Sequence, residues 1–301
     1  MSQSAYPENG AQICRVTCGW KLSQLPLDDV RQYWRDAHSP AIARRKGIYE
    51  YRHYPLDPVR EGLFGPVPDI EFGNDADQNL MWLSDVRYAS DAQLAAFNAD
   101  PGPEAKQCIL RDIDMIVDKS TTYLVLGENG RTLMDITGDP APAGPAGAPT
   151  FQVFLRKRGD IEAFRAAVKA MAQRWANAPG VQRVRLSLFE IPDMEAERKA
   201  GYPVKTHPAD LQYQAWIDLV LDSESAAKGL VQSSDSREIS VIHAYPTPDA
   251  YTFNVQGRPT LIGLRGYLAL KAIRSLGADH QRDTQLLSWM YGDVAAAGPF
   301  A

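Results

Sequence analysis

Residues 29–54, DVRQYWRDAHSPAIARRKGIYEYRHY, combine a helical pattern, a histidine, a proline and a polar strand in one short run. Apolar side chains recur there at three- and four-residue spacing, which indicates a helix with one face on a core; they are Val30, Tyr33, Trp34, Ala37 and Ala41. Because Pro40 has no backbone N–H and disfavours a helical Ser39, the helix is predicted to break beside His38, with Ser39 capping a new helical piece. Gly47 then ends that piece before a strand. The stretch therefore predicts a histidine held at a kink near a helix end.

The chain around this stretch predicts six elements in the order β-α-β-β-α-β. The strands are expected at 12–22, 48–54, 79–88 and 121–127, and the helices at 27–38 and 90–116. This is the split order of ferredoxin-like domains, in which an antiparallel sheet carries helices on one face only.

A second copy of the same plan follows a tract of Pro, Gly and Ala at 135–149, DITGDPAPAGPAGAP, which reads as a linker. Its strands are expected at 150–158, 181–191, 211–222 and 239–246, and its helices at 160–176 and 223–232. The halves also match locally, since GI at 47–48 corresponds to GV at 180–181, and MWLSDV at 81–86 to AWIDLV at 215–220. We interpret the chain as an internal duplication.

Each sheet of such a duplication has one bare face, and two sheets face to face would cover both and enclose a barrel-like interior. The predicted fold class is therefore α+β, with two tandem ferredoxin-like repeats. The expected domains are a first repeat at 10–130 that carries the candidate site, the linker at 135–149, a second and degenerate repeat at 150–256, and a C-terminal helical extension at 257–301.

Strand alternation predicts which side chains face that interior. Val184, Leu186 and Leu188 form an apolar face for helices, which leaves Arg183 and Arg185 on the inner face. The local matches place further side chains inward: Glu50, Arg52, Tyr54, Trp82, Ser84, Trp216 and Asp218. Such an interior would suit an apolar, ring-bearing ligand. The alternative is that its polar groups only pair with each other across the interface. Tyr51 alternates with Arg52 and is interpreted as packing, and His53 is left out of the site for the same reason.

Composition limits the classes of partner. The formal net charge of −5, the pI near 5.6 and the scattered basic residues argue against nucleic-acid binding. No apolar run reaches the roughly 20 residues of a membrane span, and the first residues lack the order of a signal peptide, so we expect a cytoplasmic protein. Three cysteines are too few for a disulfide framework, and no spacing of Cys or His indicates a metal site. No phosphate-binding glycine loop is present either.

The segment WRDAHSPAIAR at 34–44, followed by YEYRHY, resembles the EthD-like branch of the dimeric α+β barrel superfamily. The block at 258–281, RPTLIGLRGYLALKAIRSLGADHQ, is similar to a segment of longer members of that family. The resemblance implies a barrel of the dimeric type, made here as a pseudo-dimer within one chain. It also implies cofactor-free chemistry, since relatives include cyclases, dehydratases, lactone isomerases and decarboxylating enzymes. The helix histidine of the family maps onto His38, whereas the matching helix of the second copy has Trp175 and no histidine.

These observations lead to one functional hypothesis and two alternatives. We expect a cofactor-independent lyase or isomerase, of the dehydratase, decarboxylase or cyclase type, that acts on a hydrophobic aromatic, polycyclic or polyketide-like molecule. His38 would move the proton and Arg52 would hold an anionic group. The expected substrate-binding residues are Trp34, Glu50, Tyr54, Trp82, Arg185, Trp216 and Asp218. A non-catalytic binding protein, or a haem- or oxygen-dependent monooxygenase on the same fold, would fit the same features. We expect a homodimer, whose interface would use the outer surface or the C-terminal extension.

Overall fold

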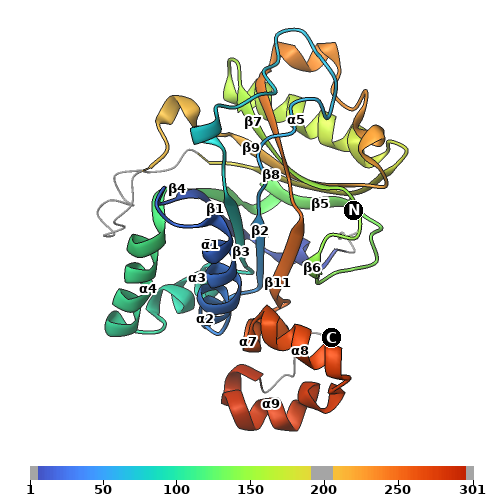
Figure 1. Cartoon of the computed structure of the whole chain (residues 1–301). Coiled ribbons are helices and arrows are strands. Elements are labelled where there is room, and N and C mark those ends of the chain that lie inside the picture. The colour runs from blue at the N-terminus through green and yellow to red at the C-terminus, as the bar shows by residue number, and fades with distance from the viewer. Residues whose placement is uncertain (1–5, 191–205, 296–301) are drawn as a thin grey trace.

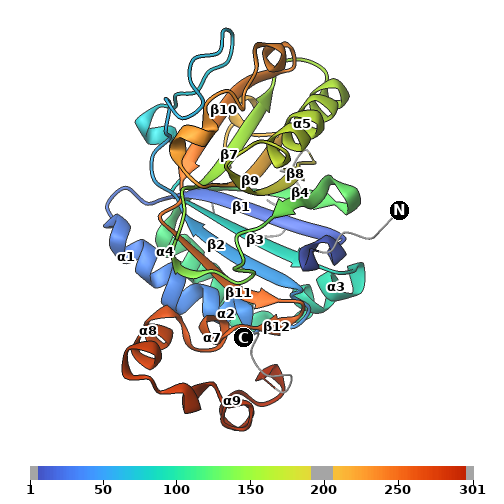
Figure 2. The same ribbon diagram turned by 90° about the vertical axis from the view of Figure 1, so that its right-hand side faces the viewer.

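The computed structural model describes residues 6–190 and 206–295, so parts of the predicted second repeat and of the C-terminal extension lie outside the described residues. Two antiparallel sheets face each other with helices on their outer sides, and α7, α8 and α9 project from one end (Figures 1 and 2). The predicted α+β class is confirmed.

The first sheet has the strand order β12-β11-β2-β3-β1-β4, with β6 paired to β11. Its strands are β1 Ile13–Lys21, β2 Glu50–Pro55, β3 Trp82–Tyr88, β4 Val117–Leu126, β6 Ala143–Pro145, β11 Asp249–Val255 and β12 Arg258–Pro259. The second sheet has the order β10-β7-β9-β8-β5. Its strands are β5 Gly130–Asp135, β7 Thr150–Lys157, β8 Val181–Leu188, β9 Ala215–Leu221 and β10 Ile239–Pro246.

The helices cover the outer faces of the two sheets and form the projecting end (Figure 1). The α-helices are α1 Leu27–Tyr33, α2 Ser39–Ala43, α3 Asp91–Ala99, α4 Pro103–Ile116, α5 Ile161–Ala176, α7 Leu261–Arg265, α8 Tyr267–Leu276 and α9 Thr284–Tyr291. Short 3₁₀ turns are η1 Pro7–Gly10, η3 Ala76–Gln78, η4 Gly127–Asn129, η5 Ala209–Leu211, η6 Glu224–Ala227, η7 Ser233–Arg237, η8 Asp279–Arg282 and η9 Gly292–Ala295. A single turn of π-helix, η2 Trp34–His38, joins α1 to α2.

Two strands that the sequence analysis missed tie the halves together. β5 follows the first four strands in the chain but pairs with β8 in the other sheet, and β11 follows the second four strands but pairs with β2. Each strand has a hydrogen-bonding partner in the opposite half, which the local sequence pattern does not reveal. The halves are therefore joined by strand pairing as well as by the tract at 135–149.

Two helix predictions need correction. The segment predicted as a helix at 223–232 contains the 3₁₀ turn η6, because Lys228 is extended and Gly229 has a φ of 79°. The start of the predicted C-terminal helical extension is divided into α7 and α8 at Gly266, whose φ is also 79°. In both places the glycine has a left-handed conformation that other residues adopt at a cost.

The space between the sheets is filled by aromatic and small apolar side chains at one end. They are Cys14, Val16, Cys18, Trp20, Tyr54, Leu56, Leu80, Leu83, Tyr123, Val125, Phe154, Phe189, Tyr213, Trp216, Tyr245 and Ala250. Tyr123 stacks on Phe189 with ring centroids 4.2 Å apart, so the two halves pack directly through their inner faces. The other end of the interior is polar and is described below.

Buried histidines predict a loss of stability in mild acid. Burial lowers the pKa of His53 and of His243 to about 3, from an ordinary value of 6.5. The unfolded chain therefore takes up these protons below pH 6.5 while the folded chain does not, so stability falls as the pH drops from 6.5 towards 3. Between pH 6.5 and 4.5 each histidine should cost roughly 2 kcal/mol, since the full slope of about 1.36 kcal/mol for each pH unit is reached only below pH 6.5.

Urea unfolding at pH 7.5, 6.0 and 4.5 measures this loss. Burial also lowers the pKa of His207, to about 4, so three histidines share this loss. The variant His243→Gln cannot gain the proton, so its unfolding free energy should decline about one third less steeply over the same interval. A wild-type protein whose unfolding free energy does not change between pH 6.0 and 4.5 would contradict the prediction.

Candidate active site

His38 lies in the π-helical turn between α1 and α2. The backbone N–H of Ser39 donates to the carbonyl of Trp34, five residues earlier, which is the π pattern. The predicted break with Ser39 as a cap is wrong, because Ser39 is helical with φ −63° and ψ −40°. Pro40 has no N–H that could donate to the carbonyl of Asp36, four residues earlier. The helix therefore takes one wider π turn here and continues instead of breaking. Such single π turns are frequent at functional sites.

Asp112 of α4 supports the His38 ring from behind. Its Oδ2 lies 3.4 Å from His38 Nδ1, and the Tyr33 hydroxyl donates to the same carboxylate. The hydrogen bond from His38 holds the pKa of Asp112 below its usual value, while burial raises the pKa of Tyr33 to about 12. An ionised Asp112 favours the tautomer that carries its proton on Nδ1. This leaves Nε2 of a neutral His38 free to accept a proton.

The C-terminal extension holds the π turn from its outer side. Asp36 Oδ1 accepts hydrogen bonds from the backbone N–H groups of Tyr267, at 2.8 Å, and Leu268, at 3.1 Å. Arg35 pairs with Asp36 at 2.5 Å and places its guanidinium over the Tyr267 ring. Asp36 therefore caps the first turn of α8, and α8 in turn fixes the turn that carries His38.

A cavity of about 130 Å³ lies between the helices and the outer face of the first sheet. Its lining residues are Arg15, Thr17, Trp34, His38, Ile42, Arg45, Tyr51, Trp82, Ser84, Val86, Tyr88, Phe97, Ile109, Ile113, Val117, Ser120 and Thr122. Trp34 stacks between His38, at 4.3 Å, and Trp82, at 4.7 Å between ring centroids. His38 is thus the titratable end of an aromatic wall.

A chain of hydroxyl groups crosses the same wall of the cavity. Ser39 Oγ lies 2.8 Å from Tyr51 Oη, and His53 Nδ1 lies 3.2 Å from Ser84 Oγ. Burial, opposed by hydrogen bonds from Ser39 and Ser84, raises the pKa of Tyr51 to about 12. Tyr51 and His53 are therefore neutral at pH 7, and His53 is held as a hydrogen-bonding group rather than a proton carrier.

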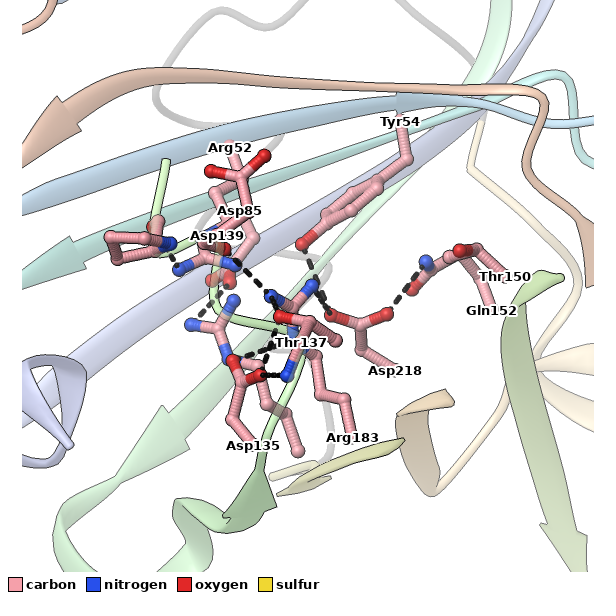
Figure 3. A network of polar contacts seen from close by, with 12 residues as sticks. Arg52, Tyr54, Asp85, Asp135, Thr137, Asp139, Thr150, Gln152, Arg183 and Asp218 are labelled. Carbon is pink, nitrogen blue, oxygen red and sulfur yellow. Dashed lines mark hydrogen bonds and ion pairs between the residues drawn. The ribbon is translucent and has the colours of Figure 1, made fainter. Parts of the chain in front are cut away.

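The predicted catalytic pair is separated by the first sheet. His38 lies on the helix-covered face, whereas Arg52 points into the interior between the sheets (Figure 3). Arg52 Nε donates to Glu50 at 2.6 Å, and Arg185 donates to both Glu50 oxygens at 3.1 Å. Asp85 accepts from Arg87 at 3.1 Å and lies 3.7 Å from Arg185. The expectation that His38 and Arg52 act on one substrate is therefore corrected.

The remaining interior groups complete this network (Figure 3). Asp218 accepts from Tyr54 at 3.4 Å and from Gln152 at 3.1 Å. Arg183 bonds Asp135 at 2.7 Å and lies 3.8 Å from Asp218. The charged members are the arginines Arg52, Arg87, Arg183 and Arg185 and the carboxylates Glu50, Asp85, Asp135 and Asp218. With four charges of each sign, the structure favours the alternative in which these groups pair with each other.

The pKa of Asp85 agrees with ionic pairing in the network. Burial by itself would raise the pKa of Asp85, but Arg87 and Arg185 outweigh it and hold that pKa below its usual value. Burial and the charge of Asp218 raise the pKa of Tyr54, so its phenol stays neutral and donates. Glu50 and Arg52 also line a cavity of about 200 Å³ where the network reaches the surface.

Trp82 and Ser84 lie on the opposite face from the one expected. They line the His38 cavity, while Leu83 and Asp85 face the interior. The error is a slip of one residue, which reverses every side chain of a strand. Aligning MWLSDV with AWIDLV on tryptophan paired Ser84 with Asp218, whereas the strand registers pair Asp85 with Arg52 in one sheet and Asp218 with Arg185 in the other.

The other predicted residues divide between the two faces. Trp34 and Trp82 share the cavity of His38, and Glu50, Tyr54, Arg185, Trp216 and Asp218 lie in the interior. Residues that the sequence analysis did not assign to the site are Arg15, Tyr51, His53 and Asp112. Alternation offered a signal for Tyr51, since a helix that carries His38 covers the face of β2 opposite to Arg52.

Comparisons with known proteins give distant structural likenesses only. No family model and no curated protein matches the sequence. A "putative monooxygenase" from Fusobacterium nucleatum is 9% identical over 83% of this chain and 99% of its own, with a TM-score of 0.46. A "putative monooxygenase" from Lactobacillus acidophilus is 10% identical, covering 81% and 97%, with a TM-score of 0.42. An anthrone oxidase-like protein is 12% identical, covering 80% and 93%, with a TM-score of 0.44. At these values no activity is transferred.

Within residues 6–190 and 206–295, every helix is too short or too polar to cross a bilayer. In the same residues, no group of three or more His, Cys, Asp or Glu side chains is arranged to hold a metal ion.

Proposed function

We propose that the protein is an enzyme that transfers a proton to or from a small aromatic substrate in the cavity of His38. The observation that supports it most is the pairing of His38 with Asp112 at the edge of an aromatic cavity. An imidazole side chain can both accept and give up a proton, and a carboxylate behind it fixes its tautomer. A histidine placed only for packing would need neither the carboxylate nor the cavity.

The size of the cavity limits the substrate. About 130 Å³ is close to the ~150 Å³ of an engineered apolar cavity that holds one benzene molecule. We therefore propose a single-ring aromatic compound in place of the polycyclic molecules considered from sequence. A haem macrocycle is several times larger than one ring, so the haem alternative requires a larger cavity than that of His38.

Arg15 supplies the positive charge that the sequence analysis assigned to Arg52. It lies on β1 beside Thr17 and lines the cavity of His38, and no ion-pair partner for it occurs among the described residues. Removing a proton from an aromatic substrate leaves a phenolate- or enolate-like anion, which a guanidinium can stabilise in a partly dry site. We propose that Arg15 faces this anion while His38 holds the proton.

The step that follows the proton transfer distinguishes a lyase from a monooxygenase. An anion formed at His38 can lose or rearrange a group, as in the lyase that we expect, or it can react with dioxygen, as in a monooxygenase. Both begin with the same proton transfer, and both differ from a binding protein, which leaves the substrate unchanged. Monooxygenase is also the word in the names of two structurally similar proteins.

Solvent deuterium exchange tests the proton transfer before the natural substrate is known. Single-ring phenols and enolisable aryl ketones are incubated with the protein in D₂O, and loss of their exchangeable C–H signals is followed by NMR. We expect exchange of at least one compound above the buffer rate. An oxygen electrode in the same reaction separates the two later steps, since only the monooxygenase consumes dioxygen. Binding of such compounds without any exchange would leave a binding protein as the function.

A further inference from the structure

A second and larger cavity lies between the C-terminal extension and the tract that links the two halves. It has a volume of about 610 Å³, within the ~300–1,000 Å³ of pockets for drug-sized ligands. One wall is the Pro/Gly/Ala tract at 137–148, and the other is formed by α7 and α8, which lie beyond the end of β11 (Figure 1). None of its lining residues lines the cavity of His38, so the two cavities are separate.

The floor of this second cavity is apolar. Leu261, Ile262 and Leu270 of α7 and α8 line it and are buried. Thr137 and Asp139 at the start of the facing tract are polar, but from residue 140 to 148 the tract contributes only Pro, Ala and Gly, among them Ala141 and Pro142. These residues offer few hydrogen bonds, so the floor suits the hydrocarbon part of a ligand.

The charges around the second cavity are unusual for this chain. The chain has a formal net charge of −5, yet three arginines and one carboxylate line this space: Arg183, Arg274, Arg282 and Asp139. Arg183 is already bonded to Asp135. Arg274 and Arg282 are exposed at the rim, and no ion-pair partner for either occurs among the described residues. Two guanidinium groups above an apolar floor are complementary to an anion with an apolar body.

We propose that this second cavity binds an amphipathic organic anion. Its carboxylate, sulfonate or phosphate lies between Arg274 and Arg282, and its hydrocarbon part lies on Leu261, Ile262 and Leu270. The site is separate in space from that of the proposed proton transfer, because it shares no lining residue with the cavity of His38.

A pair of fluorescent probes tests the charge and the location of the site. 1-Anilinonaphthalene-8-sulfonate is an amphipathic anion, and N-phenyl-1-naphthylamine is the same ring system without the sulfonate. We expect the double variant R274Q/R282Q to bind the sulfonate probe with an about tenfold higher dissociation constant. Its dissociation constant for the neutral probe should be unchanged. Ala141→Asp, on the opposite wall, should also weaken the sulfonate probe because it adds a negative charge. Arg237→Gln, an exposed arginine that does not line the cavity, is the matched control.

Each contrary result overturns the proposal. Wild-type affinity in R274Q/R282Q would place the probe elsewhere, for example on the exposed Trp289 and Leu276. An equal loss in Arg237→Gln would indicate a general charge effect, and an equal loss of the neutral probe would indicate a collapsed wall. A wild-type protein that binds neither probe has no such site.

Discussion

Replacing His38 with alanine is expected to lower turnover by roughly 10²- to 10⁴-fold and to leave ligand binding nearly intact, because general acid–base catalysis contributes about that factor. The imidazole is the titratable group of the cavity that Asp112 orients, while the aromatic wall of Trp34 and Trp82 that would contact a ring stays in place. The measurement is the deuterium exchange rate of a responsive compound, together with its dissociation constant from calorimetry.

Asp112→Asn is the matched control for the role of His38. It keeps the shape of α4 but removes the charge that favours the Nδ1–H tautomer, so we expect a smaller loss of rate than in His38→Ala, together with a shifted pH–rate profile. Unchanged exchange in His38→Ala would discard His38 as the proton carrier. A loss of binding equal to the loss of rate would instead indicate that the ring mainly shapes the cavity.

For most strand residues, the sequence predicted correctly which face of the sheet the side chain occupies. It did not predict which of these side chains lie together in one site. Arg185 and Asp218 face inward, and Val184 faces the helix, as the alternation indicated. The mistake was to join His38 to Arg52. A helix that lies on one face of a sheet presents its histidine to the side chains of that face, and in β2 these are Tyr51 and His53. Alternation therefore placed the side chains of β2 and β8, the tryptophan alignment misplaced those of β3, and the helix packing decided which face holds the site.

Other parts of the site depend on contacts between distant segments. Asp112 is 74 residues from His38 in the sequence. It lies in α4, and the sequence of that helix gives no sign of a catalytic partner. The π turn itself is held on its outer side by α8, which contacts Asp36 from more than 200 residues later. Such long-range contacts are decided by tertiary packing, which periodicity in a single sequence does not describe.

Replacing Arg185 with methionine is expected to destabilise the protein by about 3–5 kcal/mol, the usual cost of breaking a buried ion pair. Arg185 is fully buried and donates to both oxygens of Glu50, and it also lies 3.7 Å from Asp85. Methionine fills a similar volume but leaves the network with three arginines and four carboxylates. One buried negative charge would then lack compensation, which is what makes the loss large.

Arg60→Met is the control, because it removes the same type of side chain from an exposed pair. Arg60 lies 3.2 Å from Glu224, and their side chains are 59% and 51% exposed, so at most about 1 kcal/mol should be lost. The double variant E50Q/R185M should regain part of the stability lost in Arg185→Met, since it removes the uncompensated charge.

Urea unfolding at pH 7.5 gives all of these free energies. If Arg185 bound a substrate instead of stabilising the fold, the unfolding free energy of Arg185→Met would fall no more than that of Arg60→Met, and the variant would lose ligand binding. The double variant E50Q/R185M would then regain no stability. The folded fraction of Arg185→Met should instead bind ring compounds as the wild type does, because the sheet separates this network from the cavity of His38.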